Sequence, residues 1–276
     1  MFLLFLKCPV CLNLLVSTKK YKIGREELMR SDPLEILVQS KNGSERRVVP
    51  IGSVAGARYS SRDVTGMRKQ LDTMLARRES GTKTNPSIFQ IARYLLTQEA
   101  EFEVQGPLTG GEVEIVAIRD KGEILITVGS DQCDRELDPL FQDKPKQMCP
   151  HPIGRCAWIY TEVRDHWDNL KISSHVAVGE HVVPLQDCAA SELVDLEYLL
   201  AMKSVQSLIL PSILYCGSVP FLDSIVNAIE KYSLPEETSH GVCDSFLARL
   251  HDPVLNRTIE HRYRAIPVGD DLTERC

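Results

Sequence analysis

Two glutamates and one aspartate in a single short stretch have the residue types and the spacing of a metal site. Glu112 and Glu114 are two positions apart in a strand-like run, so both side chains leave the same face of the expected strand. An apolar run over residues 115–118, a turn over 119–122 and a β-branched run over 124–128 complete the pattern of a β-hairpin.

The register of this hairpin decides whether Asp131 joins the two glutamates. A four-residue turn would pair Glu114 with Thr127 and Glu112 with Gly129, and would place Asp131 on the same face. A three-residue loop would send Asp131 to the opposite face. If the three carboxylates converge, one takes a proton or a cation neutralises them, and Mg²⁺ suits such oxygen ligands. A solvated strand face is the alternative explanation of an E-x-E pattern.

The composition is that of a globular protein. The chain has 276 residues, of which 43% are hydrophobic and 25% are charged, enough to bury a substantial core. This favours one large domain with an appendage, or two unequal domains. The net charge of −6, together with the lack of a long basic run, argues against a nucleic-acid partner.

Cysteine usage indicates a reducing, cytoplasmic location. The nine cysteines show no disulfide framework in a chain too large to need one. Cys8 and Cys11 form a CxxC pair, but no second pair follows at zinc-site spacing, so two incidental thiols explain it better.

The N-terminal residues show no targeting pattern. Residues 1–16 are apolar, lack the features of a signal peptide and are too short for a membrane span. We therefore expect an ordinary buried segment or an incorrectly assigned start of the reading frame, and no membrane partner. A Ser-Asp-Pro boundary separates this extension, residues 1–33, from a domain over residues 34–276.

Periodicity and turn residues predict a mainly β domain with a few helices. A loop rich in proline, residues 136–154, carries Lys144, Lys146 and His151 as candidates for handling a substrate. The other expected elements are strands within 34–57, at 171–178, 181–185 and 208–218, a C-terminal hairpin within 246–268, and helices within 60–78, 158–170, 191–202 and 221–231.

Five motifs together resemble a known superfamily. GEVEIVAI, VGSDQCDR, KQMCPHPIG, LYCGSVP and LHDPVLNRTIEHRY resemble an uncharacterised microbial "domain of unknown function" branch of the fumarylacetoacetate hydrolase superfamily. Fungal members of that branch often carry the label trihydroxytoluene oxygenase. The resemblance covers Leu34 to Val268, and residues 221–243 look like an insertion.

This resemblance implies a fold, a cofactor and a set of site residues. The implied fold is α+β and mainly β, a fumarylacetoacetase C-terminal-like sheet roll with flanking helices, in a homodimer. The implied metal is Mg²⁺ or Mn²⁺, and it would chelate a keto or enol acid or a 1,3-dicarbonyl. The implied residues are Glu112, Glu114 and Asp131 for the metal, Lys146 or Lys144 for catalysis, and Arg135, Gly217 and Ser218 for the substrate.

The chain departs from the hydrolytic members at one point. Those members carry a His-x-x-Glu pair ahead of the E-x-E strand, whereas this chain has no histidine before His151. Glu99 or Glu101 could replace it as a base. Tautomerisation or decarboxylation thereby gains ground over carbon–carbon bond hydrolysis.

Three hypotheses follow for the function. The leading one is a divalent-metal-dependent enzyme of the hydrolase, tautomerase or decarboxylase type, in aromatic or specialised metabolism. The second is a ring-cleaving oxygenase, which would need two histidines and one carboxylate around iron. The third is a non-catalytic family member that binds a ligand. The missing His-x-x-Glu pair motivates it, as does the Cys-Gly-Ser sequence at 216–218, where the superfamily has Thr-Gly-Thr.

Overall fold

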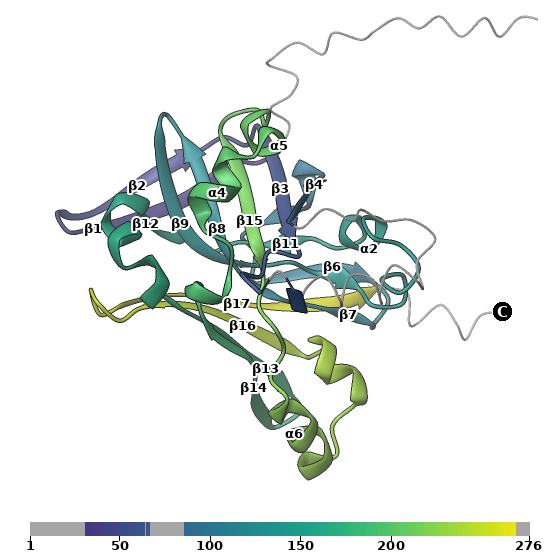
Figure 1. Cartoon of the computed structure of the whole chain (residues 1–276). Coiled ribbons are helices and arrows are strands. Elements are labelled where there is room, and N and C mark those ends of the chain that lie inside the picture. The colour runs from purple at the N-terminus through teal and green to yellow at the C-terminus, as the bar shows by residue number, and fades with distance from the viewer. Residues whose placement is uncertain (1–30, 64, 67–85, 269–276) are drawn as a thin grey trace, which may run out of the picture.

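The computed structural model describes residues 31–63, 65–66 and 86–268 (Figure 1). Residues 1–30 of the expected extension and most of the helix expected within 60–78 lie outside the described residues. In the part of the chain that is described, no helix is long and apolar enough to cross a membrane.

Two β-sheets make up most of the fold. The larger sheet has eight strands in the order β2-β1-β12-β9-β8-β15-β3-β4, with the hairpin of β8 and β9 at its centre. Its strands are β1 (Leu34–Ser40), β2 (Gly43–Val49), β3 (Ser53–Arg58), β4 (Ser87–Ile91), β8 (Val113–Asp120), β9 (Glu123–Ser130), β12 (Cys156–Ile159) and β15 (Ser212–Ser218).

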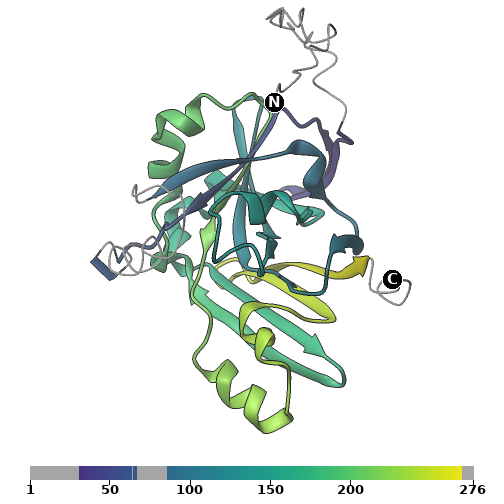
Figure 2. The same cartoon turned by 90° about the vertical axis from the view of Figure 1, so that its right-hand side faces the viewer.

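The second sheet lies against the first and has the order β14-β13-β16-β17-β6 (Figure 2). Its strands are β6 (Glu101–Gln105), β13 (Lys171–Val178), β14 (His181–Ala189), β16 (Ser245–Asp252) and β17 (Arg257–Val268). Two short pairs join β5 (Leu96–Thr97) with β11 (His151–Pro152), and β7 (Thr109–Gly110) with β10 (Cys133–Asp134). The expected mainly β fold is confirmed.

The helices are short and lie between the strands. They are α2 (Lys144–Gln147), α3 (Tyr160–Val163), α4 (Leu196–Ala201), α5 (Lys203–Gln206) and α6 (Ser224–Tyr232), with 3-10 turns η2 (Arg93–Leu95), η3 (Arg164–Asn169), η4 (Ala190–Glu192) and η5 (Glu236–His240). The single helix expected over 158–170 is wrong, because the chain continues as β12 to Ile159 and then forms α3 and η3. The helix expected over 191–202 begins only at Leu196.

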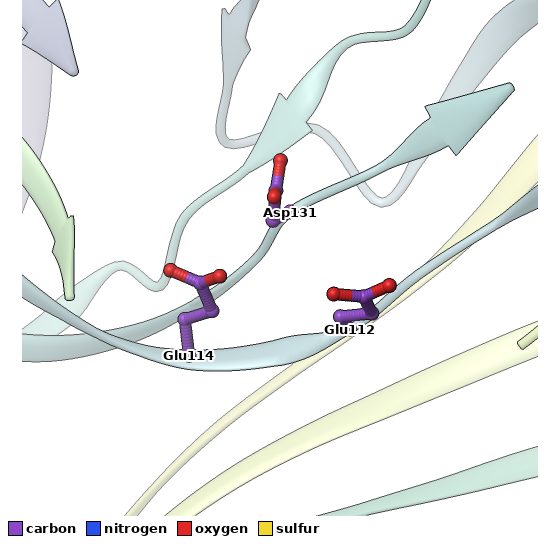
Figure 3. A group of neighbouring side chains, drawn as sticks. All are labelled: Glu112, Glu114 and Asp131. Carbon is purple, nitrogen blue, oxygen red and sulfur yellow. The ribbon is translucent and has the colours of Figure 1, made fainter. Parts of the chain in front are cut away.

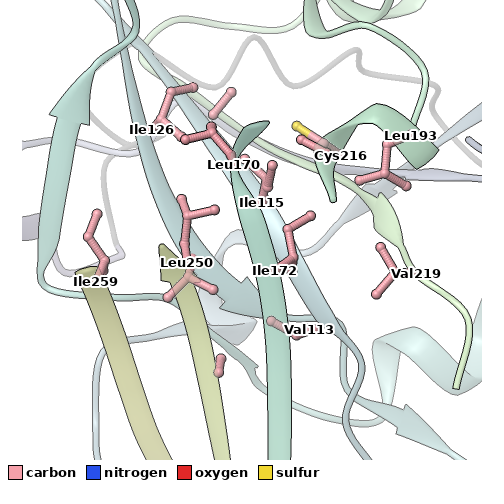
Figure 4. Packing of buried hydrophobic residues seen from close by; sticks show 14 of the residues in the cluster. Val113, Ile115, Ile126, Leu170, Ile172, Leu193, Cys216, Val219, Leu250 and Ile259 are labelled. Atoms are coloured by element: carbon pink, nitrogen blue, oxygen red, sulfur yellow. The ribbon is translucent and has the colours of Figure 1, made fainter. Parts of the chain in front are cut away.

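The central hairpin is buried on both faces, which explains why its apolar residues run without alternation. Val113, Ile115 and Ile126 pack toward the second sheet, in one core with Ile172 and Leu250 (Figure 4). The opposite face carries a second core, which includes Val116, Ile118 and Tyr215. The ends of β8 and β9 are therefore held rigidly from two sides.

The register of this hairpin differs from the expected one by two residues. The turn contains only Lys121 and Gly122, which both have positive φ, 49° and 83°. Glu114 therefore pairs with Gly129 rather than with Thr127. A shift by two residues keeps the parity of the strand, so the side chains stay on the predicted faces.

Candidate metal centre

Three carboxylates converge where the central hairpin opens. One oxygen from each of Glu112, Glu114 and Asp131 lies within 4.8 Å of the other two (Figure 3). Glu112 immediately precedes β8 and Glu114 is its second residue, while Asp131 directly follows β9. The backbone N–H of Asp131 donates to the carbonyl of Glu112 at 2.9 Å, which fixes the two chain segments against each other.

Burial makes this cluster electrostatically demanding. Glu114 is 1% exposed and Asp131 is 4% exposed. Burial, together with the neighbouring charge of Asp131, raises the pKa of Glu114 well above its usual range. Burial also raises the pKa of Glu112, but the nearby cations Lys146 and Arg135 lower it by more. The cluster thus carries more negative charge than its two neighbouring cations offset, and a further cation would favour the ionised form of Glu114.

Lys146 lies in the cluster and Lys144 does not. The Nζ of Lys146 is 2.7 Å from Oδ2 of Asp131, and both side chains are buried. Although burial lowers the pKa of Lys146, the adjacent Asp131 raises it well above its usual value, so the ammonium is retained. Burial raises the pKa of Asp131, but Lys146 and His151 together lower it below its usual value. Lys144 is exposed, with its Nζ 4.6 Å from the centre of the Phe141 ring.

Arg135 supplies the second cation. Its Nη1 donates to Oε1 of Glu112 at 2.9 Å and its Nη2 donates to the carbonyl of Gly110 at 3.4 Å. Its Nε is buried and has no hydrogen-bond partner. The predicted substrate-binding residue is therefore anchored beside the carboxylates.

His151, a candidate from the same loop as Lys146, also lies at the cluster. It is fully buried, and its Nε2 lies 2.7 Å from the carbonyl oxygen of Lys146. Its Nδ1 approaches Oδ1 of Asp131 to 3.2 Å, but without hydrogen-bond geometry, so that Oδ1 remains a buried acceptor with no donor. The only sequence signal was its position in the loop that follows Asp131.

The predicted Gly217-Ser218 turn borders the cluster. The backbone N–H of Gly217 donates to Oε2 of Glu114 at 2.8 Å, and Ser218 lies opposite Glu114 in the ladder. Gly217 has φ +102°, and a Cβ there would lie 1.7 Å from Oγ of Ser60. That hydroxyl is buried and has no hydrogen-bond partner. Only glycine fits this turn.

The expected bases are not among the residues that the structure brings together. Glu101 begins β6, in the second sheet, where its exposed side chain lies 2.9 Å from Nη1 of Arg264. Glu99 is also exposed and lies 3.4 Å from Arg155. A catalytic role for Glu101 stays a prediction.

Within the described residues, the carboxylate trio is the one group of three or more potential metal ligands. All seven histidines lie in the described ranges, and none belongs to that group. Carboxylate oxygens are the ligands of hard divalent ions such as Mg²⁺ and Mn²⁺.

Comparisons with known proteins agree with this picture of the fold. The family model described as a protein of unknown function (DUF2848) matches residues 57–263. A solved structure of Cg1458 aligns with a TM-score of 0.54 at 14% identity, over 81% of this chain and 80% of that chain. No curated protein sequence matches the chain.

A second solved structure, of 2-keto-3-deoxyarabinonate dehydratase, aligns with a TM-score of 0.54 at 16% identity, over 80% of this chain and 77% of that chain. Both alignments show a shared fold, which is the mainly β fold expected from the family resemblance. The resemblance drawn from the five sequence motifs is therefore confirmed at the level of the fold.

Proposed function

The chain belongs to the DUF2848 family and has the fold of the fumarylacetoacetate hydrolase superfamily, and on this premise we propose that it is a divalent-metal-dependent enzyme acting on a small keto or enol acid or on a 1,3-dicarbonyl. One observation carries the proposal. Oxygens of Glu112, Glu114 and Asp131 lie within 4.8 Å of one another beside a buried ammonium group.

The donor set fits a hard divalent cation. The three ligands are all carboxylates, and Oδ1 of Asp131 is a buried acceptor with no hydrogen-bond donor. Glu112, Glu114 and Asp131 would hold Mg²⁺ or Mn²⁺. When bound there, such an ion would supply Lewis-acid polarisation of a carbonyl oxygen and a template for the substrate.

Lys146 is suited to stabilising negative charge rather than to accepting a proton. Its raised pKa keeps Nζ protonated at neutral pH, and the contact with Asp131 fixes its position. A fixed ammonium in a buried site stabilises an oxyanion without reorganising at the moment of reaction. Arg135 adds a second fixed positive charge, held by Glu112. Both features suit an enolate-like transition state.

The absence of a His-x-x-Glu pair before the E-x-E strand favours reactions that need no activated water. Tautomerisation and decarboxylation meet that condition, as does elimination of water from a keto acid. One fold neighbour is named as a 2-keto-3-deoxyarabinonate dehydratase, so a keto acid is the substrate of that protein. This supports the same substrate class here.

The ring-cleaving oxygenase hypothesis has less support. It would need two histidines and a carboxylate around iron. The described residues, which include every histidine of the chain, hold no such group. The all-carboxylate cluster therefore favours Mg²⁺ or Mn²⁺ over an iron centre.

The proposed function is tested by turnover. We expect the purified protein with Mg²⁺ or Mn²⁺ to convert at least one member of a panel of acylpyruvates, oxaloacetate and 2-keto-3-deoxy sugar acids faster than the metal ion alone. Activity should disappear with a chelator and return when the ion is restored. Rates equal to the metal-only rate across the panel would support the non-catalytic, ligand-binding alternative.

A further inference from the structure

A buried glutamine of the second sheet reaches into the backbone of the metal-binding strand. Gln186 lies in β14 and is fully buried. Its Oε1 accepts hydrogen bonds from the N–H of Val113 and from the hydroxyl of Ser174, each at 2.9 Å. Its Nε2 donates to the carbonyl of Val219 at 2.7 Å.

The two backbone partners of Gln186 flank the site residues. Val113 lies between Glu112 and Glu114, so the bond to its N–H fixes the segment that carries both carboxylates. Val219 directly follows the Gly217-Ser218 turn, whose backbone N–H binds Glu114. A single side chain therefore holds the segments on both sides of Glu114.

Gln186 acts where the backbone ladder between β8 and β15 ends. That ladder shifts register between Tyr215 and Ser218, and its last pair joins Ser218 with Glu114. Continued in that register, it would bring Val219 opposite Val113. Instead, the amide of Gln186 bridges the N–H of Val113 and the carbonyl of Val219. A side-chain amide thus replaces the peptide group that the ladder lacks.

An irregularity in β14 directs this side chain. The pairing of β13 with β14 runs from Ser174↔Gln186 to His175↔Pro184, so one extra residue of β14 lies between them. A β-bulge of this kind changes the direction of a side chain next to a site. All three bonds of Gln186 are buried, so removing the amide would leave two backbone groups without partners.

We propose that Gln186 is a positioning residue, which holds the strand of Glu112 and Glu114 and the Gly217–Val219 segment in the arrangement that binds the cation. The consequence for metal binding rests on the proposed function. The mechanical role does not, because it concerns two backbone segments of the metal-free protein.

The test compares Gln186→Met with Ser174→Ala. The first removes both backbone bonds, whereas the second removes only the bond from the Ser174 hydroxyl to Oε1 and leaves both backbone bonds in place. Two readouts are measured on the full chain, namely hydrogen exchange of segments 111–116 and 217–222 without metal, and Mg²⁺ affinity by calorimetry. Unfolding midpoints of both variants show how much of each change reflects an overall loss of stability.

In Gln186→Met we expect faster exchange in both segments and Mg²⁺ binding weakened by about 10- to 100-fold. Ser174→Ala should keep both at the wild-type level. Wild-type exchange and affinity in Gln186→Met would overturn the proposal. A wild-type protein that binds no Mg²⁺ would contradict the proposed function alone, because the exchange comparison would still decide the role of Gln186.

If Gln186→Met does not fold, Gln186→Asn supplies the same test. It keeps the amide but is shorter by one methylene, so it cannot reach Val113 and Val219 together. Faster exchange in at least one of the two segments supports the proposal, and unchanged exchange in both refutes it.

Discussion

At the scale of single residues, the site is a set of buried and half-buried charges whose signs do not balance. Glu112, Glu114 and Asp131 face the two cations Lys146 and Arg135, which leaves one carboxylate charge uncompensated. Burial, together with the charge of Asp131, raises the pKa of Glu114 well above its usual range. A divalent ion would remove the conflict, which is why the charges themselves argue for a metal.

Replacing Lys146 tests its role against a neighbour in the same short helix. We expect Lys146→Met to lower kcat by about 100- to 1000-fold, because a buried, preorganised positive charge is lost. Lys144→Met should leave kcat unchanged, since Lys144 is exposed and lies over Phe141. Steady-state kinetics on the best substrate of the panel provides the measurement. Equal losses in the two variants would count against the assignment.

The Gly217 turn offers a second residue-scale prediction. Gly217→Ala should lower the free energy of unfolding by about 2 to 4 kcal/mol, because the new Cβ meets Ser60 and φ is positive. Gly122→Ala is the control, since its φ is also positive but no atom lies within 4 Å. It should cost about 1 kcal/mol.

Urea unfolding of both glycine variants measures the loss of stability that backbone strain causes. Mg²⁺ titration of the same variants measures the effect on the metal site separately. Gly217→Ala should also weaken Mg²⁺ binding, because the N–H that holds Glu114 moves. A Gly217→Ala protein as stable as Gly122→Ala, with intact Mg²⁺ binding, would show that the turn tolerates a side chain.

At the scale of elements, the sequence predicts on which face of the central hairpin each side chain lies, but not the length of its turn. The predicted parity for Glu112, Glu114 and Asp131 holds, because a shift by two residues moves no side chain to the other face. The turn was assigned too long because lysine rarely adopts positive φ, whereas Lys121 does so here.

Tertiary packing overrides the local pattern in residues 158–170. Trp158 pairs with Ile126 in the large sheet, and only the residues after Ile159 turn into helical structure. The apolar spacing of this segment reflects burial against two different neighbours rather than one helical face. Such packing is not encoded in the local periodicity that sequence reasoning uses.

The hairpin of β16 and β17 contributes a pH dependence of stability. Burial lowers the pKa of His261 to about 4, so the folded protein keeps this side chain neutral. The unfolded chain takes up the proton below about pH 6.5. The contribution of neutral His261 to the free energy of unfolding is therefore fully present above that pH and is lost as the pH falls toward 4.

His261→Leu should remove this contribution. Between pH 7 and pH 4.5 the variant should lose about 2 to 3 kcal/mol less unfolding free energy than the wild type. Urea unfolding at several pH values measures this, and parallel curves for His261→Leu and wild type would refute the assignment.

At the scale of the whole molecule, the site is assembled from segments far apart in the chain. The E-x-E segment meets the turn at Gly217, the loop of Lys146 and His151, and Gln186 from the second sheet. The sequence motifs could supply the first two contacts through the family resemblance. The contacts of His151 and of Gln186 could not be predicted from the sequence, because long-range packing decides them.

The segment expected to be an insertion, residues 221–243, also returns to the site. Val242 forms a bridge with Gly110, and the N–H of Gly111 donates to the carbonyl of Gly241 at 3.4 Å. The segment thus covers the residues that lead into Glu112.

The expected homodimer stays a prediction, which sedimentation velocity checks.

The most direct measurement of the central claim is isothermal titration of Mg²⁺ and Mn²⁺ into the wild type, Glu114→Ala and Glu123→Ala. Glu123 lies on the same hairpin but is bound to Arg47 at the turn end, away from the cluster. We expect one site in the wild type and in Glu123→Ala, and no measurable binding to Glu114→Ala. Equal affinity in all three proteins would contradict the claim that these carboxylates bind the ion.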